Sequence, residues 1–140
     1  MKAINILVID GQGGGIGKEL IFGISKKFKH SVNIIGAGTN EIATENMKIA
    51  GANISICGED NILKYADKAH IITGAIGVIT PFGIKGEITP KISEAVFKSQ
   101  AVKIMIPMNK CNIKVASKNE PLKNHINMAI SMISDEIEKY

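Results

Sequence analysis

The residues of this chain best suited to chemistry lie in one short run near its start. The run reads Asp10-Gly11-Gln12-Gly13-Gly14-Gly15-Ile16-Gly17-Lys18 and directly follows a stretch of apolar residues. Glycines in such a run allow a tight turn and let the backbone approach a ligand closely. Where a helix begins within the run, its free amides and its dipole favour a bound anion such as phosphate. The run therefore predicts a phosphate-binding loop.

Three of these glycines have separate expected roles. Gly11 permits the exit from the strand, Gly15 lets the backbone approach a phosphate, and Gly17 lies where helix and sheet pack closely. Their spacing, G-x-x-x-G-x-G, resembles the dinucleotide-binding fingerprint of short-chain dehydrogenases. That resemblance stops at about residue 18, because Tyr65 is followed four places later by Ala69 and not by the lysine of the dehydrogenase Tyr-x-x-x-Lys motif. A short-chain dehydrogenase reaction is therefore not expected.

Three further observations limit what this loop can bind. The Asp10 carboxylate would repel a phosphate unless it binds loop amides, a sugar hydroxyl or a metal. A dinucleotide site usually has an acid or an arginine at the end of the second strand, and residues 35–40 contain neither. The Walker A pattern also fails, because Gln12 stands at its first glycine and Glu19 at its hydroxyl position. A purely structural glycine turn remains the alternative.

The elements that must position this loop alternate between apolar strands and amphipathic helices. Strands are expected at residues 4–9, 32–35, 53–57, 69–73 and 102–106, with a sixth at 113–116 in one interpretation. Most are followed by a helix pattern, so the fold class is α/β: a Rossmann-like, doubly wound, mainly parallel sheet of five or six strands with helices on both faces. Right-handed crossovers predict the strand order 3-2-1-4-5 in a single domain, residues 1–140.

Other candidate residues follow the carboxyl ends of the remaining strands. Thr39 and Asn40 follow the second strand, with one of them capping the next helix, and Gly74, Ile76 and Gly77 follow the fourth. Because the fourth strand is expected beside the first, these loops should face each other across a ligand crevice. The predicted ligand-binding residues are Asp10, Gly11, Gln12, Gly13, Gly14, Gly15, Ile16, Thr39, Asn40, Gly74, Ile76 and Gly77.

A possible reactive group follows the fifth strand. Lys110 and Cys111 are the candidate catalytic residues there, although no histidine is evidently placed to activate the thiol. Cys57 and Cys111 are far apart and are expected to be reduced, and no metal site is expected. In the last helix, Met128 and Met132 widen the apolar stripe, which predicts core packing, with a homodimer contact as the alternative.

Composition excludes several classes of function. The chain has 140 residues, 45% hydrophobic and 21% charged, which is typical of a globular protein. Its net charge of +4 comes from 17 basic residues that are all lysine and are scattered along the chain. Without arginine, a patch or a motif, nucleic-acid binding is not expected. Neither a membrane span nor a signal peptide is evident, so we expect a cytoplasmic protein with no membrane partner.

Nearly the whole chain resembles a family of short bacterial proteins catalogued as domain of unknown function 3842. The resemblance depends on residues 9–17, 38–40, 74–77, 86–90 and 109–112. It implies a bacterial cytoplasmic protein and supplies no activity.

The sequence thus leaves three functions open. The leading hypothesis is a sensor or binding module that holds a nucleotide or another phosphate-bearing ligand, such as NAD(P), a mononucleotide or coenzyme A. The second is a small enzyme that uses residues near Cys111, and the third is an interaction protein in which the glycine loop is only structural.

Overall fold

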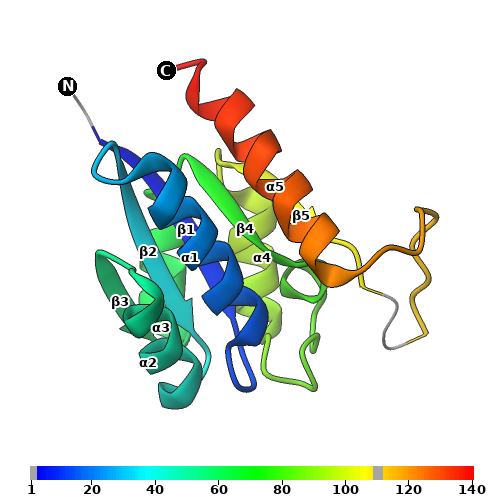
Figure 1. Cartoon of the computed structure of the whole chain (residues 1–140). Helices are drawn as coiled ribbons and strands as arrows, with labels where there is room; N and C mark the ends of the chain where they lie inside the picture. Colours follow the sequence, from blue (N-terminus) through cyan, green and yellow to red (C-terminus); the bar gives the residue numbers. More distant parts are fainter. Residues whose placement is uncertain (1–2, 109–111) are drawn as a thin grey trace.

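A five-stranded parallel sheet forms the centre of the protein, seen in a computed structural model that describes residues 3–108 and 112–140. The strand order β3-β2-β1-β4-β5 confirms the predicted doubly wound, Rossmann-like topology (Figure 1). The strands are β1 (Ile4–Asp10), β2 (Val32–Gly38), β3 (Ile54–Cys57), β4 (Ile71–Ala75) and β5 (Val102–Ile106). Each neighbouring pair is parallel, as expected where helices connect successive strands.

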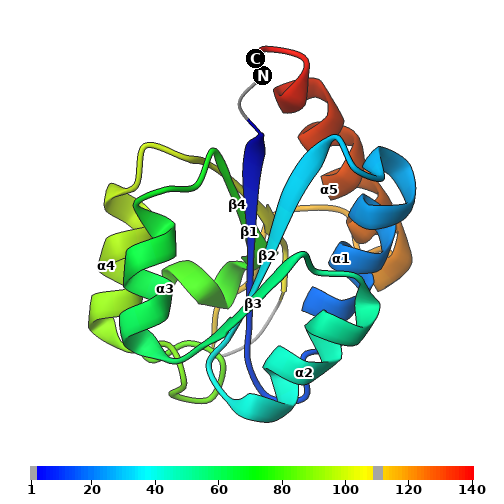
Figure 2. The same cartoon turned by 90° about the vertical axis from the view of Figure 1, so that its left-hand side faces the viewer.

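Helices cover both faces of this sheet (Figure 2). They are α1 (Gly15–Phe28), α2 (Glu41–Ala50), α3 (Glu59–Ala66), α4 (Pro90–Lys98) and α5 (Leu122–Ile137), together with the 3-10 helix η1 (Ile76–Ile79). The apolar sides of α1, α2 and α5 form one core against the sheet, while α3, α4 and η1 form the other. The three central strands β1, β2 and β4 are buried on both faces along most of their length, which explains their continuous apolar sequences.

The sequence signals for helix ends correspond to real caps. The side chain of Asn40 accepts a hydrogen bond from the amide of Ala43 at 2.8 Å, which starts α2, and Gly51 ends that helix at a φ of 123°. Thr89 caps α4 in the same way, with Pro90 as the first helical residue. These caps fix the positions at which the chain leaves the carboxyl edge of the sheet.

Three expectations from the sequence are wrong. The segment 113–116 is not a strand, because Ile113, Lys114 and Ala116 are exposed and have no apolar layer to cover. Gly74 is not a loop residue but part of β4, where an added Cβ would lie 2.6 Å from the carbonyl oxygen of Ile9. Met128 and Met132 of α5 are exposed, at 60% and 49%, and do not extend the buried stripe of that helix.

The carboxyl ends of β1 and β4 form the switch point of the sheet. β1 continues into α1 on one face, and β4 continues into η1 on the other face. The two connecting loops lie at the same edge, the lower one in Figure 1. Ligands bind at this point in doubly wound folds, because the diverging chains leave a crevice between them. Among the described helices, none is long and apolar enough to span a membrane.

Candidate functional site

A cavity of about 790 Å³ occupies the crevice between β1 and β4. One wall is the glycine loop with the end of β1, residues 10–16, and the other wall is formed by residues 75–77 and 80–85. Met108 and Ile113 complete the lining at the β5 side. The volume lies within the range of small-molecule sites, and the walls combine backbone-rich glycine segments with apolar side chains.

The predicted ligand residues divide into two groups around this cavity. The whole run from Asp10 to Ile16 lines it, as do Ile76 and Gly77. Thr39, Asn40 and Gly74 are not among its lining residues. The candidate catalytic residues Lys110 and Cys111 lie outside the described residues, so their prediction stays untested.

Asp10 acts as a cap for α1 from within β1. Its Oδ2 accepts a hydrogen bond from the amide of Gly17 at 2.6 Å, and its Oδ1 accepts one from the amide of Gly11 at 2.7 Å. The side chain is 6% exposed. Burial, together with the nearby charge of Glu87, raises the pKa of this carboxyl above its usual value, although hydrogen bonds from loop amides act in the opposite direction. The carboxylate therefore uses loop amides, which was one of the three arrangements expected to offset its charge.

Close packing explains two of the loop glycines. A Cβ on Gly17 would lie 2.7 Å from the Sδ atom of Met47 in α2 and 2.9 Å from the Cβ atom of Asp10. A Cβ on Gly11 would lie 2.7 Å from the Oγ1 atom of Thr39. The role inferred for Gly17 thus agrees with the geometry. Gly11 is needed because the end of β2 approaches it closely, rather than for the turn itself.

Gly15 differs from these positions because it has open space around it. An added Cβ there would meet no heavy atom within 4 Å, and the residue is exposed at the start of α1. Its φ is not positive, so a side chain would not strain the backbone. The glycine at this position is therefore not required by the fold.

Two amides of the glycine loop are available to a ligand. The carbonyl of Gln12 accepts from the side chain of Asn40 at 2.9 Å, and the carbonyl of Gly14 accepts from the amide of Lys18 at 2.8 Å. In a trans peptide the N–H points opposite to its C=O, so the N–H groups of Gly13 and Gly15 point away from these partners. Neither amide donates a hydrogen bond among the described residues. Both residues line the cavity.

Glu87 closes the side of the glycine loop that faces β2. Its Oε1 accepts hydrogen bonds from the Thr39 hydroxyl at 2.5 Å, from the side-chain amide of Asn40 at 2.9 Å and from the backbone amide of Gln12 at 3.1 Å. Its Oε2 accepts from the side-chain amide of Gln12. Burial opposes ionisation of Glu87, but these hydrogen bonds outweigh it and lower the pKa from 4.5 to about 2. We call this arrangement, Glu87 with Gln12, Thr39 and Asn40, the Glu87 clasp.

The loop that carries Glu87 has an unusual backbone. Phe82, Ile84 and Lys85 have φ values of 62°, 52° and 52°, in the left-handed region that side chains rarely adopt. The loop is closed on itself by backbone hydrogen bonds, such as the one from the Phe82 amide to the Ile88 carbonyl at 2.7 Å. Strain of this kind persists only where the surroundings enforce it, and it is concentrated at ligand sites. Here it places Phe82, Ile84 and Lys85 in the cavity wall.

Comparison with known proteins gives the family of this chain. The family described as Domain of unknown function (DUF3842) matches residues 5–138. The chain belongs to this family. Among curated proteins, no sequence matches it.

The solved structures that resemble this DUF3842 protein include a universal stress protein in complex with cAMP. The two chains are 19% identical, and the match covers 76% of this chain and 98% of that chain at a TM-score of 0.42. A likeness of this degree carries no functional conclusion for this chain.

Sequence reasoning missed the part of this candidate site that comes from residues 80–87. Glu87 belonged to a stretch noted for the family resemblance, but no spacing rule connects it with the glycine loop. Lys85 and Glu87 are the charged residues of the otherwise neutral segment 71–90, and this was the available signal. Among the described residues, no group of three or more His, Cys, Asp or Glu side chains is arranged to hold a metal ion.

Proposed function

We propose that this protein binds a nucleotide or another small phosphate-bearing ligand in the cavity between the glycine loop and residues 75–85, and that it acts as a binding module. The observation that carries the proposal is the cavity itself, with the unused amides of Gly13 and Gly15 in its wall at the start of α1. Free amides at a helix N-terminus favour an anion through hydrogen bonds and through the helix dipole.

The phosphate would sit at the outer turn of the glycine loop. Asp10 already holds the Gly17 amide, so the inner position at the start of α1 is filled by a carboxylate. The amides of Gly13 and Gly15 remain, and Lys85 in the opposite wall supplies a positive charge.

The remainder of the cavity suits an apolar or aromatic group such as a nucleobase. The cavity is lined there by the apolar side chains of Ile16, Ile76, Phe82 and Ile84, and by Met108 at the β5 side. Ligand sites of this size bury most of the ligand surface against apolar side chains, while a few polar groups fix its orientation. A nucleotide combines both parts, because it has a flat ring at one end and a phosphate at the other.

A thermal-shift screen of the full chain tests the proposal. The panel contains the four 5′-mononucleotides, NAD⁺, NADP⁺ and coenzyme A, with the free nucleosides as controls that lack phosphate. A ligand at 100 times its dissociation constant adds about 2.7 kcal/mol to the free energy of unfolding. At least one phosphate-bearing compound should raise the melting temperature. If none does, and native mass spectrometry finds no phosphate-bearing molecule on the purified protein, the proposal is wrong.

A further inference from the structure

The Glu87 clasp occupies the place where a dinucleotide-binding fold receives a ribose. In such folds the ligand crosses the end of β1, and an acid at the end of β2 accepts hydrogen bonds from the ribose hydroxyls. Here the end of β2 carries Thr39 and Asn40, and both donate hydrogen bonds to Glu87. A carboxylate is thus present near this position, but it comes from the loop after β4.

This carboxylate has no capacity left for a ligand. A carboxylate offers about four lone-pair positions. The donors of the clasp are the Thr39 hydroxyl, the side-chain amides of Asn40 and Gln12, and the backbone amide of Gln12, which approaches both oxygens at 3.1 Å and 3.3 Å. A ribose hydroxyl would therefore have to displace a protein donor.

Close packing around Gly11 also blocks the β2 side of the crevice. Around Gly11, an added Cβ would lie 2.7 Å from the Thr39 hydroxyl, 2.9 Å from Oε1 of Glu87 and 3.0 Å from the Cγ2 atom of Ile84. No space remains between the glycine loop and the end of β2 for a sugar. In agreement, the cavity extends from the glycine loop only toward β4 and β5, and neither Thr39 nor Asn40 is part of its lining.

We infer that Glu87 is a specificity-determining residue: it blocks the β2 side of the crevice and restricts the site to a mononucleotide-sized ligand on the β4 side. This inference rests on the proposed function. It excludes the extended dinucleotide pose, in which one nucleoside lies on each side of β1. The ligand class that remains is a nucleotide with a single nucleoside, whose phosphate lies at the glycine loop.

The test compares 5′-mononucleotides with NAD⁺ on the full chain by isothermal titration calorimetry. The wild-type protein should bind its best mononucleotide at least tenfold more tightly than NAD⁺. Glu87→Ala should narrow this ratio by tenfold or more, chiefly through a gain in NAD⁺ affinity, because it frees the donors on Thr39 and Asn40. Equal affinity of the wild-type protein for NAD⁺ and the mononucleotide would overturn the inference and leave the proposed function intact. Absence of binding by every phosphate-bearing compound would overturn the proposed function instead.

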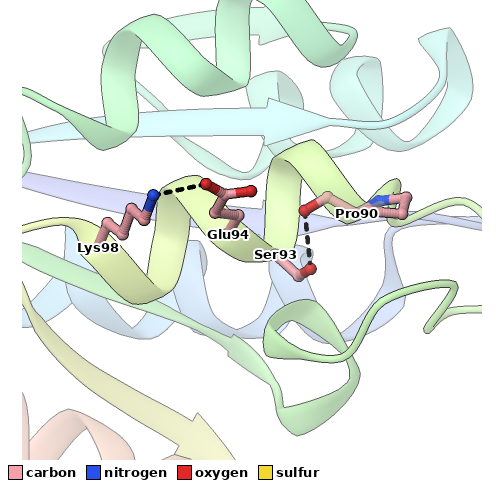
Figure 3. Close-up of polar contacts among 4 residues, drawn as sticks. All are labelled: Pro90, Ser93, Glu94 and Lys98. Carbon is pink, nitrogen blue, oxygen red and sulfur yellow. Dashed lines mark hydrogen bonds and ion pairs between the residues drawn. The ribbon is translucent and has the colours of Figure 1, made fainter.

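Glu94→Ala is the matched control. Glu94 lies on α4, seven residues after Glu87, and pairs with Lys98 at 2.6 Å on the exposed side of that helix (Figure 3). It is not a lining residue of the cavity, so both affinities should stay at their wild-type values. A change in the affinity ratio as large as that of Glu87→Ala would count against a specific role for Glu87.

NMR chemical shifts of the wild-type protein show directly on which side of β1 the ligand binds, so this test needs no variant. The amide signals of ¹⁵N-labelled wild-type protein are followed during titration with the best mononucleotide. The largest shifts should occur at residues 13–16 and 76–85. Largest shifts at Thr39 and Asn40 would overturn the inference, because they would place the ligand on the β2 side.

Discussion

The Oδ2 atom of Asp10 accepts a hydrogen bond from the backbone amide of Gly17 at 2.6 Å. The start of α1 is thereby occupied by a carboxylate of the protein and not by a ligand. A helix N-terminus attracts anions, and in many doubly wound folds that anion is a ligand phosphate. In this protein the Gly17 amide already donates to Asp10, whereas the amides of Gly13 and Gly15 have no acceptor within residues 3–108 and 112–140. In the proposed function the glycine loop is a shared anion site, with the carboxylate of Asp10 on the inside and the ligand phosphate on the outside.

Replacing Asp10 by Asn should destabilise the protein. The side-chain oxygen of Asn can accept from only one of the two amides, and its NH₂ group would face the other donor. A buried donor without an acceptor costs about 1–3 kcal/mol; Asn also removes the buried charge that raises the Asp10 pKa, so we expect a net loss of about 1 kcal/mol in denaturant unfolding. A variant as stable as the wild-type protein would show that the two amide hydrogen bonds do not hold α1 against β1.

Removing the Glu87 side chain should loosen both loops that it joins. Glu87→Ala leaves Gln12, Thr39 and Asn40 without their common acceptor, and we expect a loss of about 2–3 kcal/mol. Most domains have 5–15 kcal/mol of stability, so the variant should still fold. Amide hydrogen exchange should become faster at residues 11–14 and 82–88 and change little in the central strands. Uniform acceleration across the sheet would contradict a local clasp.

The Glu87 clasp should also make the free energy of unfolding depend on pH in the acid range. The folded-state pKa of Glu87 is lowered from 4.5 to about 2, so its ionised form stabilises the native state above pH 4.5. This contribution is lost as the pH falls from 4.5 to 2. Screening of a half-buried group limits it to about 1–2 kcal/mol. Asp10 acts in the opposite direction, because its pKa is raised and it favours the folded state at low pH.

Comparison with Glu87→Gln isolates this effect. Both proteins retain Asp10, so the difference in their unfolding free energies reports on the Glu87 carboxylate, including its repulsion of Asp10. The difference should be largest at neutral pH and should shrink as the pH falls from 4.5 to 2. A difference that stays constant across this interval would mean that the Glu87 carboxylate is not specially stabilised in the folded protein.

Lys85 should contribute to the affinity for phosphate and not to that for the nucleoside. If the best mononucleotide binds as proposed, Lys85→Gln should weaken it about tenfold, because a charge-assisted contact in the cavity wall is lost. Binding of the variant should also depend less on salt concentration. Lys91→Gln, on the exposed side of α4 and outside the cavity lining, is the control. Equal weakening of the phosphate-free nucleoside would argue that Lys85 acts only through packing.

Most of the fold could be predicted from the sequence, but only one wall of the candidate site could. Alternating apolar strands and helices determined the strand order, and Asn40 and Thr89 marked helix starts, because these signals are local. The Glu87 clasp joins residues that are 47 to 75 positions apart and depends on how one loop folds. Left-handed backbone is normally signalled by glycine or asparagine, and Phe82 and Ile84 give no such signal. That wall of the cavity could not be predicted from pattern alone.

Gly15 and Gly17 separate a ligand-binding loop from a purely structural one. Gly17→Ala places a methyl group 2.7 Å from Met47 Sδ and 2.9 Å from Asp10 Cβ, so overpacking should cost about 1–3 kcal/mol and lower the melting temperature by roughly 5–10 °C. Gly15→Ala meets open space with an ordinary φ, and alanine favours a helix over glycine, so its melting temperature should stay the same or rise slightly.

The ligand response of the Gly15 variants completes the test. If the Gly15 amide holds a phosphate, the larger side chain of Gly15→Val should abolish the thermal shift caused by the best mononucleotide while the melting temperature without ligand stays near normal. Gly15→Ala should weaken the shift to a smaller degree, and the folded fraction of Gly17→Ala should still bind. Full binding by Gly15→Val would show that the ligand does not approach this part of the backbone. The glycine at position 15, which the fold itself does not require, would then have no role in a phosphate site.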